Sequence, residues 1–349
     1  MIKILHSADW HLDSPLQSND DLRNALRAIP EKITALCKVE NCDMMLLAGD
    51  LFDGVATPAT VQTLKQFLAD AGVPVFITPG NHDYVGANSP WLTEVWPENV
   101  HIFTKDTIAS VYLPELGCRV YGAGFVSMDC GSLLEGFTAN PEVLSIGIFH
   151  GDPTQVTSPY CPITTAQVQN SGLAYLALGH IHKGGSFQAG KTLCAWPGCP
   201  MGRGYDEEGE KGALIVTIDE GVYTRFVPLN TPQFYDWQID AGDDAAAALD
   251  SLLPPVGNGH YYRVTFTGSS EPLDLQRLYR AEFPNLKLRD KTVPPVDIWS
   301  SAGEDTFEGM YFGRLQKALE DADEDGARQI RLAAQISRKI LEGQEVTLP

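Results

Sequence analysis

Five short hydrophobic segments of the chain each lead to a polar turn that carries carboxylate, amide or imidazole side chains. The first begins at Ile2, which opens a run typical of a buried strand, and leads to Asp9 and His11. Alternate residues of an extended turn can point the same way, so these two side chains can hold one ion. Four later turns repeat the design: Gly49-Asp50, Gly80-Asn81-His82-Asp83, His150-Gly151-Asp152 and Gly179-His180-Ile181-His182. Because ligands of open α/β sheets gather at the carboxyl ends of strands, the turns predict one shared site.

Length and composition predict a globular protein of about two domains. The chain has 349 residues and 44% apolar residues, enough to bury a sizeable core. No apolar run approaches the roughly 18 residues that a membrane span needs, and no signal peptide is evident. The seven cysteines include no Cys-x-x-Cys pair, which makes a disulfide framework or a structural zinc site unexpected. We therefore expect a reducing, cytoplasmic location and no membrane contact.

The formal net charge of −20 argues against a nucleic-acid binder that acts alone, because phosphate contacts need lysine and arginine. Two effects weaken this objection. Bound metal ions would neutralise several of the acids, and a basic partner subunit could supply the grip on DNA. The alternative, that the charge serves only solubility, is left open by the sequence.

The N-terminal part alternates strands and helices, which predicts a parallel sheet. Residues 20–39 have helical spacing interrupted at Pro30, and Thr57-Pro58 opens a second helix that Gly72 ends. Strands are expected at 43–48 and 73–78. A more antiparallel second layer is then expected from strands at 100–103, 108–113, 119–125, 144–149 and 174–178 and from hairpins at 186–191 and 213–227. The predicted fold class is α/β, with a two-layer β-sandwich flanked by helices.

The pattern changes near residue 230. Strands at 234–239, 261–266 and 286–288 with helices at 243–253 and 272–283 predict a small α+β domain. A loop at 293–305 leads to helices at 306–319 and 327–341, each with an apolar stripe; that of the first comprises Phe307, Met310, Tyr311 and Leu315. The expected domains are therefore 1–230, a capping domain at 231–292 and a helical tail at 293–349.

The polar turns together predict a metal centre. The candidate ligands are Asp9, His11, Asp50, Asn81, His150, His180 and His182. Mixed carboxylate, amide and imidazole donors suit Mn²⁺, Fe or Zn²⁺ better than Mg²⁺, which prefers oxygen ligands. A carboxylate shared by two divalent ions would hold them about 3.5–4 Å apart, as in two-metal phosphoryl-transfer sites.

The five turns match, in order, the five motifs of the calcineurin-like metallophosphoesterases, which the chain resembles. Within that superfamily three segments resemble the SbcD/YhaO-type DNA repair exonucleases: LHSADWHL at 5–12, AGDLFD at 48–53 and ALGHIHK at 177–183. The segments PGCPMGR at 197–203 and EGEKG at 208–212 favour the YhaO-like side of that group. The resemblance in sequence motifs covers residues 1 to about 230. After residue 230 only the order of the parts matches, a small capping domain followed by helices.

The resemblance implies a role for each residue. It places Asp9, His11 and His182 on a first metal ion, and Asn81, His150 and His180 on a second, with Asp50 as the bridge. His82 matches the catalytic histidine that faces the scissile phosphate. Asp83 is expected to fix the turn or orient His82. Asp53 stands where archaeal and eukaryotic members have a histidine that directs exonuclease action, and bacterial chains tend to have aspartate, so strand polarity stays open.

The function implied is two-metal hydrolysis of DNA, with Mn²⁺ preferred, by the nuclease subunit of a complex with an SbcC- or YhaN-like SMC-type ATPase. The resemblance also implies a homodimer. A small-molecule or nucleotide phosphoesterase is one alternative, although a small substrate does not need the C-terminal domains. A structural adaptor for an ATPase is another, although an adaptor need not keep seven ligands. Outside the turns, His6 is expected to be a hydrogen-bonded core residue and Asp206-Glu207-Glu208 a surface loop.

Overall fold

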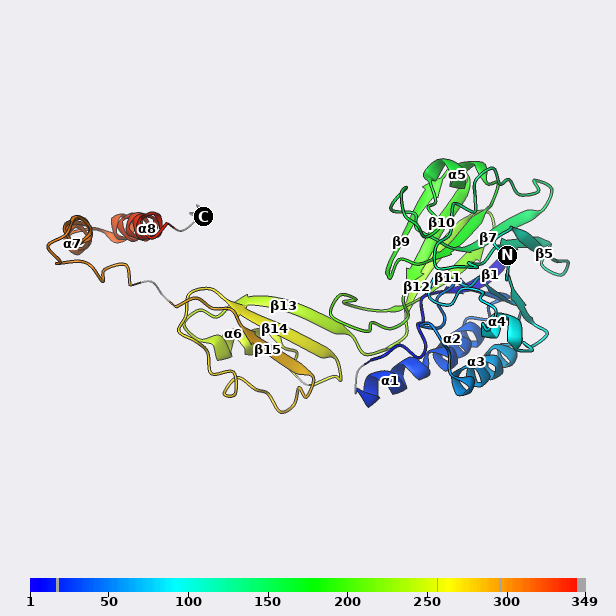
Figure 1. Cartoon of the computed structure of the whole chain (residues 1–349), viewed down its shortest axis with the longest axis horizontal. Helices are drawn as coiled ribbons and strands as arrows, with labels where there is room; N and C mark the ends of the chain where they lie inside the picture. Colours follow the sequence, from blue (N-terminus) through cyan, green and yellow to red (C-terminus); the bar gives the residue numbers. More distant parts are fainter. Residues whose placement is uncertain (17–18, 256, 295–296, 344–349) are drawn as a thin grey trace. The chain divides into compact units, whose positions relative to one another are not determined.

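The computed structural model describes residues 1–16, 19–255, 257–294 and 297–343. It divides into two compact units, Met1–Trp237 with Pro255–Val264 and Arg280–Lys287, and the remainder of the C-terminal part from Gln238. Two six-stranded sheets lie face to face in the first unit, with α1–α4 outside one sheet and α5 beyond the other (Figure 1). The predicted sandwich flanked by helices is confirmed.

The first sheet has the order β12-β11-β1-β2-β3-β4. Its strands are β1 (Ile2–Ser7), β2 (Met44–Leu47), β3 (Val75–Ile77), β4 (Val100–Ile102), β11 (Gly212–Ile218) and β12 (Val222–Pro228). Strands β1 to β4 are parallel, and β11 lies antiparallel to β1 with Ile4 opposite Val216. The hairpin at 213–227 and the strand at 100–103 thus belong to this sheet, and their assignment to the second layer was wrong. The alternation of a hairpin is the same on either sheet, so the pattern does not identify its partner.

The second sheet has the order β5-β6-β7-β8-β10-β9. Its strands are β5 (Ala109–Leu113), β6 (Cys118–Gly122), β7 (Leu144–His150), β8 (Tyr175–Gly179), β9 (Lys183–Ala189) and β10 (Thr192–Gly198). Strands β6, β7, β8 and β10 are parallel, and only the edge strands β5 and β9 run antiparallel to their neighbours. The antiparallel pairing expected in this layer is therefore confined to its two edge strands. The parallel strands end together, which brings the turns after β7 and β8 to one edge.

The core forms because the strands of the first sheet alternate between two apolar faces. Ile4 and Leu46 pack between the sheets, whereas Leu5 and Leu47 pack against the helices. Those helices are α1 (Asp20–Arg27), α2 (Ile29–Val39), α3 (Pro58–Asp70) and α4 (Pro90–Thr93), and α5 is Thr165–Asn170. The break expected near Pro30 lies at Ala28, so the proline occupies the first turn of α2.

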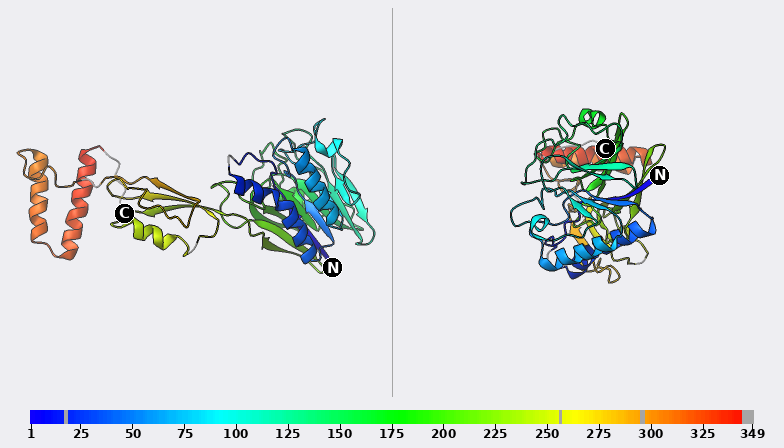
Figure 2. Two further views of the ribbon diagram at one scale, coloured as in Figure 1. Left: turned by 90° about the horizontal axis from the view of Figure 1, so that it is seen from below. Right: turned by 90° about the vertical axis from the view of Figure 1, so that its right-hand side faces the viewer.

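The described residues from 234 onward form a three-stranded sheet and three helices. The strands are β13 (Phe234–Asp240), β14 (Tyr261–Thr267) and β15 (Leu286–Asp290), and the helices are α6 (Ala245–Leu252), α7 (Phe307–Glu320) and α8 (Glu324–Leu341). Residues 272–283 form turns, so the helix expected there was wrong. Asp290 accepts the backbone N–H of Leu273, and Asp274 accepts that of Gln276 at 3.2 Å, local bonds that compete with a helix. Helices α7 and α8 pack side by side, with Tyr311 bonded to Ser337 (Figure 2).

Candidate metal centre

The turns after β1 and β2 are joined by backbone hydrogen bonds. The N–H of Asp9 donates to Gly49 at 3.0 Å, and that of His11 donates to Asp50 at 2.9 Å. Asp9, His11, Asp50 and His180 have positive φ of 55°, 48°, 51° and 95°. This left-handed conformation costs a non-glycine residue of the order of 1–3 kcal/mol, and such strain is concentrated at functional sites. Four of the seven predicted ligands therefore lie on strained backbone.

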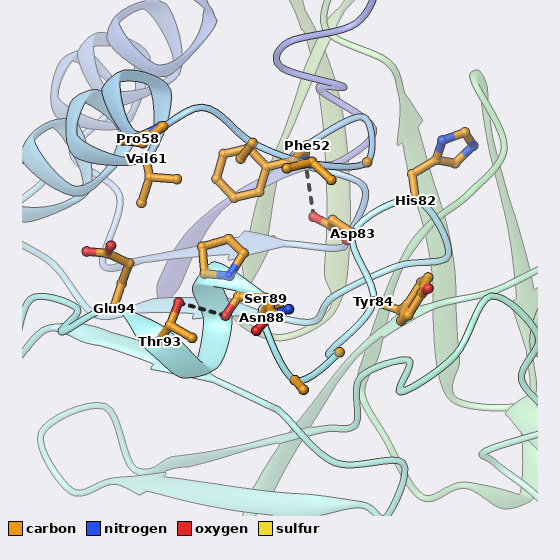
Figure 3. Close-up of a pocket in the computed structure, with 16 residues that line it drawn as sticks. Phe52, Pro58, Val61, His82, Asp83, Tyr84, Asn88, Ser89, Thr93 and Glu94 are labelled. Atoms are coloured by element: carbon orange, nitrogen blue, oxygen red, sulfur yellow. Dashed lines mark hydrogen bonds between the residues drawn. The ribbon is translucent and has the colours of Figure 1, made fainter.

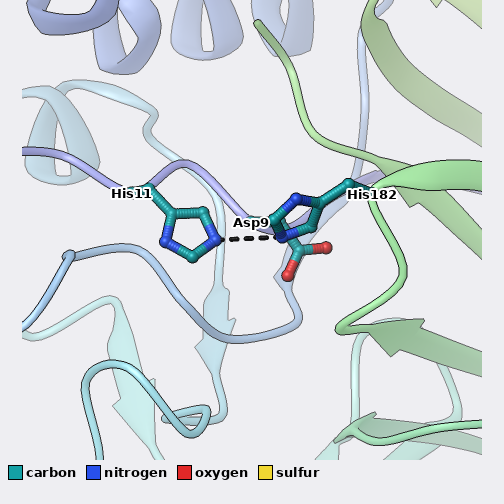
Figure 4. Close-up of side chains that lie close together, drawn as sticks. All are labelled: Asp9, His11 and His182. Carbon is teal, nitrogen blue, oxygen red and sulfur yellow. Dashed lines mark hydrogen bonds between the residues drawn. The ribbon is translucent and has the colours of Figure 1, made fainter. Parts of the chain in front are cut away.

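Asp9, His11 and His182 form a first group of donors, with one ligand atom from each within 4.8 Å of the others. The Nε2 atoms of His11 and His182 face each other at 3.1 Å, as Figure 4 shows. His182 Nδ1 lies 2.6 Å from a carboxylate oxygen of Glu207, which accepts its proton and leaves Nε2 as a lone-pair donor. The other ring nitrogen of His11, Nδ1, is buried and lies 3.6 Å from Asp53 Oδ1, just beyond hydrogen-bond distance. A cation between the two rings and Asp9 fits this donor set.

Asn81, His150 and His180 form a second group. His150 Nδ1 donates to the carbonyl of Ala48 at 2.9 Å, so its Nε2 is free of a proton in the neutral ring and lies 2.9 Å from Asn81 Oδ1. His180 Nδ1 lies 3.2 Å from the same oxygen. Burial lowers the pKa of His180 to about 4, which keeps its ring neutral and able to bind a metal.

Asp50 lies between the two groups. Its Oδ2 is 3.8 Å from His11 Nε2 and 3.3 Å from His150 Nε2. Glycines permit this close approach: a Cβ on Gly80 would lie 2.2 Å from Asp50 Oδ1, and one on Gly49 would lie 2.5 Å from His150 Nδ1. The structure thus brings all seven predicted ligands together, with Asp50 in the position that a bridging carboxylate needs.

His82 and Asp53 lie beside the first group. His82 Nδ1 is 2.8 Å from Asp53 Oδ1, and 45% of the His82 side chain is exposed. The neighbouring imidazoles of His11 and His82 hold the pKa of Asp53 well below its usual range, and the hydrogen bond to Asp53 raises the pKa of His82. The predicted catalytic histidine therefore stands at the surface of the cluster, with its ring oriented by the residue whose role the sequence left open.

Asp83 has a structural position. Its carboxylate accepts the backbone N–H groups of Gly80 at 2.7 Å and Leu51 at 2.8 Å. Burial, followed by the charge of Asp50, raises the pKa of Asp83 to about 7. Asp83 thus connects the turn after β3, in which it lies, to the turn after β2. This is the turn-fixing position that was expected for Asp83. The side chain that contacts His82 is Asp53 and not Asp83.

Two residues of the site were missed. Glu207 is buried, so the expectation that Asp206-Glu207-Glu208 forms a surface loop was wrong at this position. Besides His182, its carboxylate contacts Arg203, whose Nη2 lies 2.8 Å from Oε1. Arg203 Nη1 in turn lies 3.9 Å from Asp53 Oδ2. One sequence signal could have indicated them: Arg203 and Glu207 are four residues apart in a glycine-rich segment that follows β10. The signal is weak, because the residues on both sides of Glu207 are exposed acids.

We expect Glu207→Gln to weaken metal binding. The carboxylate fixes the tautomer of His182 and increases its basicity, and loss of such a partner typically lowers metal affinity about 10–100-fold. Competition between the protein and a chromogenic chelator for Mn²⁺ measures the effect. Asp206→Asn is the matched control, because Asp206 is the exposed neighbour. Equal Mn²⁺ affinity of Glu207→Gln and the wild type would contradict the role.

Residues 2–184 match the calcineurin-like phosphoesterase family. The match covers more than half of the chain and contains all five turns. The chain is a calcineurin-like phosphoesterase. It is thus a metal-dependent phosphoester hydrolase, of a family that uses two divalent metal ions, and the resemblance stated from the motifs is confirmed.

Two relatives from Bacillus subtilis (strain 168) belong to the group that the motifs indicate. The phosphoesterase is 32% identical to the uncharacterized metallophosphoesterase YhaO over 240 residues, 63% of this chain and 58% of YhaO. It is 24% identical to the D subunit of the nuclease SbcCD over 388 aligned positions, 92% of this chain and 95% of that subunit. A dimetal phosphatase from Danio rerio is 12% identical with a TM-score of 0.46 over 65% of this chain and 96% of its own. The helices of the described residues include none that is long and apolar enough to span a membrane.

Proposed function

We propose that the phosphoesterase hydrolyses phosphodiester bonds of DNA as a nuclease subunit that uses Mn²⁺. The observation that carries the proposal is the position of Asp50, whose Oδ2 lies within 4 Å of a histidine from each donor group. The similarity to the D subunit of SbcCD over 92% of the chain supports DNA as the substrate. Seven unpaired cysteines support the cytoplasm as the location.

Each group of side chains has a chemical role. Asp9, His11 and His182 would hold one ion, Asn81, His150 and His180 the other, and Asp50 both. When bound, such a pair supplies an activated water and neutralises charge on the phosphoryl oxygens. His82 is accessible and faces the site, and it donates a proton to the departing oxygen while Asp53 keeps its ring oriented.

A nuclease assay tests the proposal. End-labelled single-stranded and double-stranded DNA is incubated with protein and Mn²⁺, and again in excess chelator. We expect metal-dependent cleavage of at least one substrate. The lengths of the labelled products show from which end of the strand cleavage proceeds. Hydrolysis of mononucleotides with intact DNA would instead favour the small-molecule phosphoesterase.

We further propose that residues 1–230 form the nuclease domain, 231–292 a capping domain and 293–349 a tail that binds an SbcC- or YhaN-like ATPase in a dimeric complex. Helices α7 and α8 cover each other through buried Phe312 and Ala334. The predicted stripe on α7 is only partly used, because Phe307 remains 73% exposed and Met310 57%. Exposed apolar side chains on such a helix pair support a partner surface. The net charge of −20 favours a partner that brings basic DNA contacts.

We expect Phe307→Asp with Met310→Asp to abolish co-purification with the ATPase. Both side chains are exposed, so the helix pair keeps its internal contacts. Gln316→Asp is the matched control on an exposed position of α7. Metal-dependent hydrolysis of a small diester should persist in both variants. ATPase binding by the double variant at the level of the wild type would rule out this surface.

A further inference from the structure

A pocket of about 600 Å³ lies beside His82 in the first unit. Two of the five ligand turns build its wall: Gly54, Val55 and Ala56 follow Asp50 and Asp53, and Tyr84 follows His82. The backbone N–H of Gly54 donates to the carbonyl of His82 at 3.1 Å, which holds the two turns together. In Figure 3, His82 and Glu94 lie at opposite sides of this pocket. His82 thus joins the pocket to the first donor group, because its Nδ1 contacts Asp53 and its ring centroid lies 4.7 Å from that of His11.

The lining is mostly apolar and is open at the rim. Phe52, Pro58, Val61 and Pro90 line it, and the starts of α3 and α4 enclose it. At the rim Val55 is 95% exposed and Tyr84 is 40% exposed. Apolar side chains exposed around a hollow of this size are typical of a ligand site, since such sites range from about 300 to 1,000 Å³.

The charge of the lining does not suit a phosphate group in this pocket, in addition to the scissile phosphate at the metal centre. Among its 16 lining residues, all described, none is lysine or arginine. Glu94 adds a carboxylate, which bonds Lys65 at 2.9 Å and Gln62 at 3.2 Å. The lining also includes the ionisable His82 and the buried Asp83. Asn88, Ser89 and Thr93 are neutral, and an amide and hydroxyls can both donate and accept hydrogen bonds. A planar, uncharged group with donors and acceptors at its edge fits this lining, whereas an anion does not.

We propose that this pocket binds the base of the nucleoside on the leaving side of the scissile phosphate. The proposal rests on the proposed function, in which His82 faces the departing oxygen. Because His82 forms the pocket edge nearest the metal centre, the sugar attached to that oxygen directs its base into the pocket. Nucleobases are flat and neutral, and they stack on apolar and aromatic side chains such as Pro90 and Tyr84. The pocket therefore selects diesters whose leaving group is a nucleoside.

A substrate pair tests the proposal. One is a dinucleoside monophosphate, and the other is the same molecule with the leaving base removed. We expect the wild type to show a kcat/KM about tenfold higher for the substrate with the base, near the lower range of base stacking. Ala87→Trp, at an exposed lining position, should reduce that ratio to about one. Leu92→Trp, on α4 but outside the lining, should keep the ratio of the wild type.

A binding measurement separates this proposal from the proposed function. Saturation-transfer NMR with free deoxyadenosine requires no hydrolysis, and we expect transfer with the wild type and Leu92→Trp but not with Ala87→Trp. A wild-type ratio of one, or an unchanged ratio in Ala87→Trp, would overturn the pocket assignment and leave nuclease activity intact. A protein inert on every diester would overturn the proposed function, and the NMR result would then decide the pocket by itself.

Discussion

Replacing Asp50 by alanine is expected to remove essentially all phosphodiester hydrolysis, a loss on the order of 10³-fold or more, together with bound metal. Asp50 Oδ2 faces a histidine of each donor group, so its loss removes a ligand from both. Its Oδ1 also accepts the backbone N–H of His82 at 2.8 Å, so the variant releases the turn that positions His82. Metal analysis and steady-state rates on a small diester measure the two effects.

Asp152→Asn is the matched control for Asp50→Ala. Asp152 lies in the turn after β7, two residues from His150, and its Oδ1 accepts hydrogen bonds from Thr154 and Gln155. An asparagine oxygen can keep those bonds, so this variant should retain metal and activity. If Asp50→Ala bound as much metal as the control and hydrolysed the diester equally well, Asp50 would not be the bridging ligand.

His82→Ala should lose on the order of 10²–10³ in rate while it keeps its metal, which distinguishes it from Asp50→Ala. The side chain is 45% exposed and belongs to none of the contacts that join the seven ligands. Its removal therefore leaves the donor groups in place and takes away the proposed proton donor for the departing oxygen. A circular dichroism spectrum and a metal analysis equal to those of the wild type would establish that the fold and the centre persist.

His101→Ala is the control for the loss of an imidazole. His101 lies on β4, where its ring stacks on Phe76 with centroids 5.0 Å apart, and it is outside the donor groups. Its removal should leave the rate within about twofold, since it touches no reacting group. Wild-type turnover by His82→Ala would show that the role assigned to His82 is wrong.

The clustering of the seven predicted side chains could be anticipated because its signals are local. Asp9 and His11 lie in one turn, as do His180 and His182, and each turn follows a strand that is apolar in sequence. The parallel sheets then bring these turns to the same edge, which the strand–helix alternation implies for the first sheet. The assignment of the seven side chains to individual metal ions stays a prediction that the metal analyses above address.

Features that depend on distant partners could not be predicted. Strand β11 pairs with β1 across about 200 residues of sequence, and nothing in its alternation distinguishes that partner from a strand of the second sheet. Glu207 is buried with its carboxylate bound by His182 and Arg203, whereas its neighbours in sequence are exposed acids. The turn at 272–283 was misread because Asp290, on β15, holds the backbone of Leu273 in another conformation.

The most direct measurement is the titration of metal-free protein with Mn²⁺ while hydrolysis of a DNA oligonucleotide is followed. We expect no hydrolysis in excess chelator and a rise in rate that reaches its plateau at about two equivalents of Mn²⁺ per chain, because both donor groups must be filled. Full hydrolysis in chelator, or a plateau at one equivalent with a single ion bound per chain, would contradict a two-metal nuclease.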